Sequence, residues 1–158
     1  MPFSAILRAG HFPRTRMLDV RFNQPITVDP KGRITLPLRL KSRLDVERTR
    51  TLVFIVWGDH LRAYTHQDFR ERVEKKFLEL DSFEPSQEAL QRRVLGWATE
   101  LDFDDAGRMV VPAHLRQMAG IERDVLAISM ADRLELWDVA RFHAWWNANN
   151  PSTDGARG

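Results

Sequence analysis

The residues best suited to bind a polyanion occur twice, within one short motif. Residues 29–33 read DPKGR and residues 104–108 read DDAGR, so Asp, Gly and Arg recur at the same spacing. An arginine guanidinium is always charged and carries a planar set of donors that can pair with phosphate or, through two parallel hydrogen bonds, with guanine. Arg33 and Arg108 are therefore the candidate nucleic-acid contacts, and the lysine at position 31 is a third candidate in the first copy.

Each motif also predicts a tight turn between two short strands. Apolar and polar side chains alternate over residues 26–28 and again over 34–36, which is the period of a half-buried strand. Aspartate at the first position of a type I turn accepts backbone N–H bonds, and glycine at the fourth tolerates positive φ. We interpret both copies as β-hairpins. The residues that form the turns and orient the arginines are Asp29, Gly32, Asp104 and Gly107.

An aspartate and an arginine at this spacing could also form nothing more than a surface ion pair. Exposed pairs of this kind contribute roughly 0–1 kcal/mol, which is too little to make the arrangement essential for stability. The functional interpretation is that the aspartate orients the arginine for phosphate or base contacts. Duplication of the motif in two related halves favours this second interpretation.

The duplication extends beyond the motif. The strand-like segments TLVFIVW and HLRAYT, at 51–57 and 60–65, recur after 73 positions as VLAISM and RLELWD. Pro37 and Pro112 suit the first position of the short helices that should follow each hairpin. Further helices are expected after the capping residues Thr65 and Asp138, and one near Ser86 whose Leu90, Val94 and Trp97 form a stripe.

Composition excludes several classes of protein. Among the 158 residues there is no cysteine, so neither a disulfide framework nor a thiolate nucleophile is possible. The five histidines show no metal-ligand spacing, and no GxSxG or GxxxxGK[ST] motif occurs. We therefore expect no enzyme, no cofactor, no metal, no small-molecule substrate and no membrane span. Residues 1–50 hold eleven Lys/Arg against four Asp/Glu, a net charge of +7. This charge suits a polyanionic partner and equally a solvated surface whose charge is uneven.

The two motif segments resemble a known family. DPKGRITLP and ATELDFDDAGRMVVPAHLRQMAG are similar to the two signature segments of the MraZ family of bacterial regulators, which carry tandem SpoVT-AbrB-type domains. The resemblance covers about residues 17–146. It implies an α+β fold in which two homologous β-rich halves interleave as a pseudo-dimeric barrel with outer helices. The implied domains are an N-terminal extension at 1–16, a first half at 17–80, a connecting helix at 81–97, a second half at 98–146 and a disordered tail at 147–158.

The resemblance further implies a cytoplasmic, nucleoid-associated transcriptional repressor of the division and cell-wall gene cluster. Such a protein would form a ring-like homo-oligomer and bind direct repeats of short G-rich boxes in double-stranded promoter DNA. The family's arginine contacts fall on Arg33 and Arg108, and Lys31 matches the usual lysine, whereas the second copy has Ala106 there. The alternative is an oligomeric β-barrel interaction protein, or an antitoxin-like scaffold, without a specific DNA site.

Overall fold

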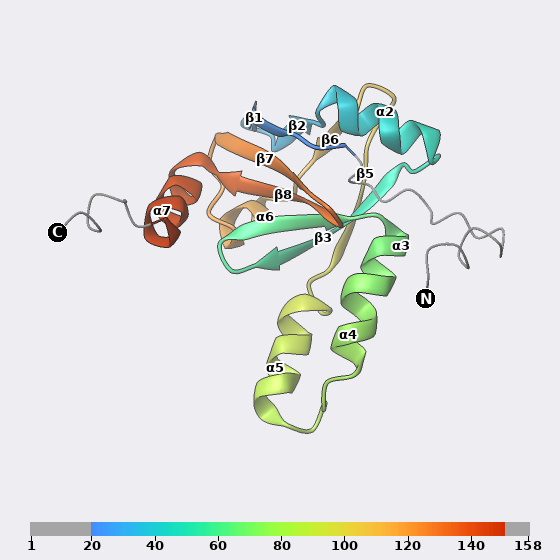
Figure 1. The fold of residues 1–158 in the computed structure, drawn as a ribbon, viewed down its shortest axis with the longest axis vertical. Helices are drawn as coiled ribbons and strands as arrows, with labels where there is room; N and C mark the ends of the chain where they lie inside the picture. Colours follow the sequence, from blue (N-terminus) through green and yellow to red (C-terminus); the bar gives the residue numbers. More distant parts are fainter. Residues whose placement is uncertain (1–19, 151–158) are drawn as a thin grey trace.

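The computed structural model describes residues 20–150 as an antiparallel sheet with helices around it and a short strand pair on its inside (Figure 1). The α+β class is confirmed. The elements are β1 (Asn23–Thr27), β2 (Arg33–Thr35), α2 (Leu38–Val46), β3 (Thr51–Trp57), β4 (His60–Tyr64), α3 (His66–Phe69), η1 (Arg70–Glu74), α4 (Lys75–Leu78), α5 (Pro85–Val94), β5 (Thr99–Asp102), β6 (Arg108–Val110), α6 (Ala113–Met118), β7 (Asp124–Met130), β8 (Arg133–Asp138) and α7 (Val139–Asn149). The expected extension at 1–16 lies outside the described residues, as does the tail from residue 151.

The two halves exchange strands. In the six-stranded sheet, ordered β1-β7-β8-β4-β3-β5, β1 of the first half pairs with β7 of the second, and β5 of the second half pairs with β3 of the first. The prediction of two hairpins is therefore wrong. The Asp29 N–H does donate to the Arg33 carbonyl, at 3.1 Å, but beyond this turn β1 and β2 diverge. β1 and β2 each pair with a strand of the other half instead.

β2 and β6 pair with each other as a separate antiparallel ribbon, rather than joining the sheet. The large sheet consequently ends at β1 and β5, which make no strand pairing to one another in the described part of the chain. The expected barrel is thus not closed. The physical reason is that Ile34 and Met109, opposite each other in the ribbon, are buried against the inner face of the sheet. The ribbon covers that face instead of extending its edge.

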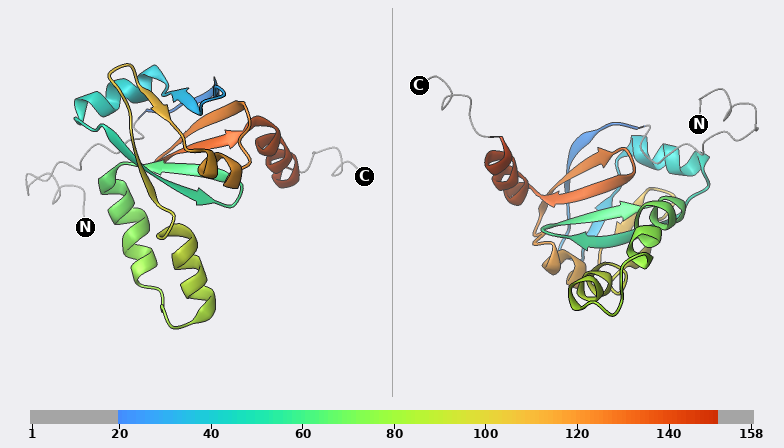
Figure 2. Two further views of the ribbon diagram at one scale, coloured as in Figure 1. Left: turned by 180° about the vertical axis from the view of Figure 1, so that it is seen from behind. Right: turned by 60° about the horizontal axis from the view of Figure 1, so that its bottom comes forward.

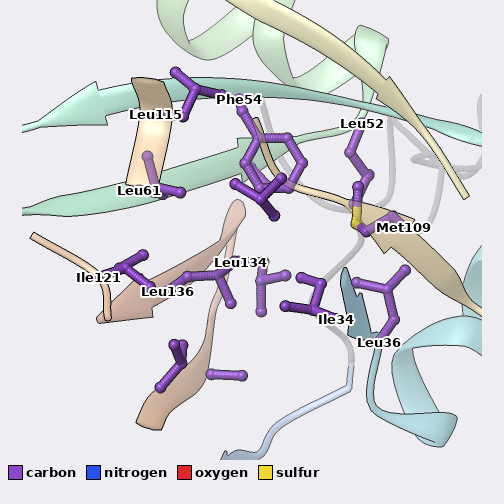
Figure 3. Packing of buried hydrophobic residues seen from close by; sticks show 14 of the residues in the cluster. Ile34, Leu36, Leu52, Phe54, Leu61, Met109, Leu115, Ile121, Leu134 and Leu136 are labelled. Atoms are coloured by element: carbon purple, nitrogen blue, oxygen red, sulfur yellow. The ribbon is translucent and has the colours of Figure 1, made fainter. Parts of the chain in front are cut away.

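The main core lies between the ribbon and the inner face of the sheet (Figure 3). Alternate residues of the central strands point inward, among them Phe54 of β3, Leu61 of β4 and Leu134 of β8, and all three are fully buried. Leu40 of α2 and Leu115 of α6 close the core at the same depth. Because Ile34 of β2 and Met109 of β6 belong to this core, the ribbon has a fixed position.

The outer face of the first half carries a helical hairpin. The helix from α3 through η1 to α4 runs antiparallel to α5, and the pair projects from the sheet (Figure 2). Phe69, Val73 and Val94 from these helices pack on Val53 and Ile55 of β3 in a second core cluster. Leu90 packs against this cluster as predicted, but the expected stripe does not include Trp97, which is 48% exposed beyond the last turn of α5.

Most helix boundaries agree with the caps that the sequence indicates. The Thr65 hydroxyl accepts from the Asp68 N–H, and the Asp138 carboxylate accepts from the Ala140 N–H. Pro37 and Pro112 lie one position earlier than expected, since they are the N-cap residues of α2 and α6 rather than their first residues. The helix α7 continues to Asn149, so a domain boundary placed after residue 146 falls inside it.

A buried polar cluster joins the halves on the outer face, where β4 pairs with β8. Arg62 is directly opposite Glu135 in this pairing. The Glu135 carboxylate accepts from Arg133 Nε at 2.8 Å and from Trp137 Nε1 at 3.0 Å, and it lies 3.5 Å from His60 Nε2. Burial raises the pKa of Glu135, but the hydrogen bonds from His60 and Trp137 and the charges of His60 and Arg133 outweigh this effect and lower the pKa from 4.5 to about 2. The carboxylate is therefore ionised at neutral pH.

Candidate nucleic-acid interface

Both motif arginines lie on one exposed face of the β2–β6 ribbon. In its register Arg33 is opposite Val110, and Thr35 is opposite Arg108. These four side chains are exposed, whereas Ile34 and Met109 between them point into the core. The two arginines therefore occupy diagonal corners of one face, with their Cα atoms about 8 Å apart by strand geometry.

An open groove runs along this face. Its lining includes both aspartates and both arginines of the duplicated motif, although the two copies are separated by 75 positions in the sequence. The full set of lining residues is Thr27, Asp29, Arg33, Ile34, Thr35, Asp104, Arg108, Met109 and Val110. The fold has thus converted two distant turns into a single surface.

Each aspartate holds its turn and its arginine at the same time. One Asp29 oxygen accepts the N–H groups of Lys31 and Arg33, both at 2.9 Å, and the other accepts from Arg33 Nε at 2.5 Å. Asp104 repeats this pattern with Arg108, whose Nε lies 3.0 Å from its carboxylate. The arginine side chains remain 57% and 66% exposed. In both copies the aspartate is thus hydrogen-bonded to the backbone of its turn and to the side chain of its arginine.

The same hydrogen bonds keep the aspartates ionised. The backbone N–H of Arg33, followed by its side chain, lowers the pKa of Asp29 below its ordinary value. The backbone N–H of Arg108 is the first cause of a lowered pKa at Asp104, and the Arg108 side chain adds to it. Each carboxylate therefore stays charged and bound to its arginine throughout the neutral pH range.

Both turn glycines have positive φ, at +83° for Gly32 and +79° for Gly107. A Cβ atom at Gly32 would lie 2.7 Å from the Val111 carbonyl oxygen, whereas at Gly107 it would meet only the flexible Lys41 side chain at 3.3 Å. Val111 N–H donates to the Gly32 carbonyl, so this close approach is part of the pairing between β2 and β6. The two copies of the turn therefore differ in how tightly the ribbon packs behind them.

Gly32→Ala is expected to lower the free energy of unfolding by more than about 2 kcal/mol, and Gly107→Ala by about 1 kcal/mol. Both substitutions place a side chain in the left-handed region, but only the first also forces a backbone carbonyl to move. Urea unfolding of the two variants measures the difference. Equal losses would show that the close approach at Gly32 has no energetic consequence.

The sequence pattern did not predict that Thr35 and Val110 belong to this surface. It did suggest Lys31, because of its position in the motif. Thr35 and Val110 share the exposed face because they lie two positions after the arginines, a spacing that the strand alternation already indicated. Their position opposite the arginines depends on the β2–β6 pairing, which the hairpin interpretation did not contain. Lys31 is exposed at the tip of the first turn, where Ala106 occupies the second.

Other kinds of site find little support in residues 20–150. No group of three or more His, Asp or Glu side chains in this range is arranged to hold a metal ion. None of the helices that the structure describes has the length and apolar character needed to cross a membrane. The feature that distinguishes this surface is the pair of aspartate-held arginines.

The fold and this surface define a protein built from two interleaved α+β repeats that present one β-ribbon with two exposed arginines. The chain belongs to the MraZ family, whose model, described as "MraZ protein, putative antitoxin-like", matches residues 23–93 and again 94–156. Similar proteins carry the name "Transcriptional regulator MraZ". That of Coxiella burnetii (strain Dugway 5J108-111) is 36% identical over 75% of this chain and 78% of its own. The protein of Shewanella denitrificans is 36% identical over 76% of this chain and 78% of its own length. The protein of Mannheimia succiniciproducens is 33% identical over 77% of this chain and 80% of its own length.

Proposed function

We propose that this protein is a sequence-specific DNA-binding transcriptional regulator that contacts DNA through the exposed face of the β2–β6 ribbon. The observation that carries the proposal is the pair of exposed arginines, Arg33 and Arg108, each held by an aspartate on one groove. The similar proteins are named transcriptional regulators, which supports the proposal.

The ribbon has the dimensions of a major-groove reader. A two-stranded antiparallel ribbon fits a major groove about 12 Å wide. The separation of about 8 Å between the Cα atoms of Arg33 and Arg108 spans two to three base steps along the DNA. Asp29 and Asp104 bind the Nε atoms, and the terminal nitrogens of both arginines make no hydrogen bond to another described residue. Those nitrogens are therefore available for guanine O6 and N7, with their direction already set before DNA binds.

Three neighbouring side chains complete the surface. Lys31 would contact a phosphate beside the first turn, and its absence at Ala106 would make the two sides of the ribbon unequal. Val110, opposite Arg33, is suited to a thymine methyl group, whereas Thr35, opposite Arg108, offers a hydroxyl. The ribbon would then read an asymmetric box, which agrees with direct rather than inverted repeats in the DNA.

The proposed biological role is repression of the division and cell-wall gene cluster, from a nucleoid-associated position in the cytoplasm. Several protomers in a ring-like homo-oligomer would each bind one short G-rich box of a direct repeat. When several protomers are linked in this way, the overall affinity for the repeated DNA is high even if the affinity for each box is modest, because each further contact forms at high local concentration.

The test is a fluorescence-anisotropy titration with DNA from upstream of the protein's own operon, beside a shuffled duplex of the same composition. We expect selective binding to the native DNA, and an affinity that falls steeply as salt rises because phosphate contacts release counterions. Equal affinity for both duplexes would contradict sequence-specific recognition. No salt-dependent binding at all would favour the interaction scaffold.

A further inference from the structure

A cation from the second half contacts the turn that carries Arg33. Leu115 of α6 is fully buried in the main core (Figure 3), so this helix has a fixed position at the end of β6. The next residue, Arg116, is half-buried, and its Nε donates to the Val111 carbonyl at 3.0 Å. Val111 directly follows β6, and its own N–H donates to the Gly32 carbonyl at 2.8 Å. Two hydrogen bonds through Val111 therefore connect the Arg116 guanidinium to the first turn.

The first turn is held from two sides at one peptide group, the one that joins Gly32 to Arg33. Its carbonyl accepts from the Val111 N–H, and its N–H, which belongs to Arg33, donates to Asp29 at 2.9 Å. The other oxygen of the same carboxylate accepts from Arg33 Nε. The orientation of this peptide therefore affects where the carboxylate lies, and the carboxylate in turn fixes where the Arg33 guanidinium points.

The Arg116 side chain also lies close to this peptide group. A Cβ atom at Gly32 would be 3.0 Å from both Nε and Nη2 of Arg116. Gly32 is buried, whereas the side chain of Arg33 is 57% exposed. Arg116 thus contacts the turn on its buried side, and Arg33 leaves the turn on its exposed side.

The equivalent position in the first half is built differently. Lys41 of α2 lies 75 positions before Arg116, and it meets the second turn through carbon atoms, since a Cβ atom at Gly107 would be 3.3 Å from its Cγ. Its Nζ is bound by both oxygens of Asp45, at 2.6 and 2.5 Å. The residue equivalent to Asp45 is Gly120, so no carboxylate competes for Arg116 at that position. Within residues 20–150, Arg116 is therefore the one of these two cations that donates to the backbone continuing a ribbon strand.

We propose that Arg116 is a positioning residue for Arg33, which fixes the Gly32–Arg33 peptide from the opposite half and so sets the direction in which Arg33 meets the bases. This inference rests on the proposed function and deepens it, because it identifies a residue that controls base recognition by the same ribbon. Arg116 does not contact DNA in this role. Without it, Arg33 keeps its charge and its attraction to DNA but loses part of its fixed direction.

The experiment is an anisotropy titration against the native promoter duplex and against duplexes in which each base pair of the nuclease-protected region is changed in turn. Arg33→Ala and Arg108→Ala first identify the base pairs that each arginine reads, as those whose change no longer alters affinity. Arg116→Met removes the donor and keeps an unbranched side chain. It should lower the preference at the base pairs read by Arg33 by about threefold to tenfold, and at those read by Arg108 by less than about twofold.

Two further variants separate positioning from loss of charge and from loss of fold. Lys41→Met removes a cation at the equivalent position of the first half without removing a hydrogen bond to the ribbon, so it should leave the preferences at all base pairs unchanged. Arg116→Lys keeps a donor, so it should lose less preference than Arg116→Met. Urea unfolding shows whether each variant is folded, and Arg116→Lys carries the test by itself if Arg116→Met is not.

Three results would overturn the proposal. Unchanged base preferences in folded Arg116 variants would show that the bond to Val111 has no part in recognition. Equal losses at the base pairs read by Arg33 and by Arg108 would make the effect a general one on the ribbon. An equal loss of affinity for every duplex, with a salt dependence reduced by about one phosphate contact, would make Arg116 a DNA contact itself. If Arg33→Ala and Arg108→Ala alter no base preference, the proposed regulator fails first and this inference with it.

Discussion

Arg33→Ala and Arg108→Ala are each expected to lower the affinity for the native promoter DNA by about 10-fold to 100-fold per ribbon. Both side chains lie on the exposed ribbon face, and their neighbours Ile34 and Met109 make the contacts with the core. Thermal stability should therefore change little, because an exposed ion pair contributes at most about 1 kcal/mol. In an oligomer that binds several boxes the loss is repeated at each one, so binding should become undetectable.

Two control variants separate the effect of the arginine's fixed orientation on DNA affinity from the effect of its positive charge. Arg93→Ala removes the same charge from the exposed side of α5 and should leave affinity within about twofold, since it is remote from the ribbon. Arg33→Lys keeps the charge but replaces the planar guanidinium, which Asp29 holds through Nε, with a flexible ammonium group whose direction is not set. It should therefore retain salt-dependent binding and lose selectivity between the native and shuffled duplexes. Unchanged affinity in both alanine variants would refute the assignment of these contacts.

The sequence predicted local features of the fold well because they depend on neighbouring residues. The strands at 51–57 and 60–64, the Thr65 and Asp138 caps and both Asp–Arg turns follow from side-chain period and capping chemistry. Strand pairing, in contrast, depends on whether two distant segments bury more apolar surface together than each would bury with its neighbour in the sequence. Ile34 could pair locally across its turn, but against Met109 it also contacts the core of both halves. The pattern of neighbouring residues cannot show which of these two pairings buries more apolar surface.

The candidate site was predictable in its residues but not in its arrangement. The motif identified Arg33 and Arg108, and alternation placed each of them on a solvent face. Two separate hairpins would have given two separate basic turns. The exchange of strands instead places both arginines on one ribbon, and brings Thr35 and Val110 beside them. The distance between the arginines is therefore a property of the interleaved pair of halves.

Glu135→Gln is expected to lower the free energy of unfolding by about 3 kcal/mol at pH 7. The folded pKa of about 2, against an ordinary 4.5, means that the ionised carboxylate stabilises the folded state by roughly that amount. Because the folded pKa is the lower one, this contribution is complete above about pH 5 and is lost as pH falls toward 2. Urea unfolding of wild type and variant between pH 7 and 2.5 should show their difference shrinking over that range. Glu79→Gln, at an exposed glutamate, is the matched control.

The same cluster explains why unlike halves pair. Residues 62 and 135 are equivalent positions of the repeat, and they oppose each other across the β4–β8 junction as Arg and Glu. Two first halves would place arginine against arginine there, and two second halves glutamate against glutamate, with several kcal/mol at stake for an uncompensated buried charge. Arg62→Glu should therefore destabilise the chain more than Arg62→Gln does at pH 7, in the same urea measurement. If the two variants were equally stable, the opposed charges would have no part in selecting the pairing of unlike halves.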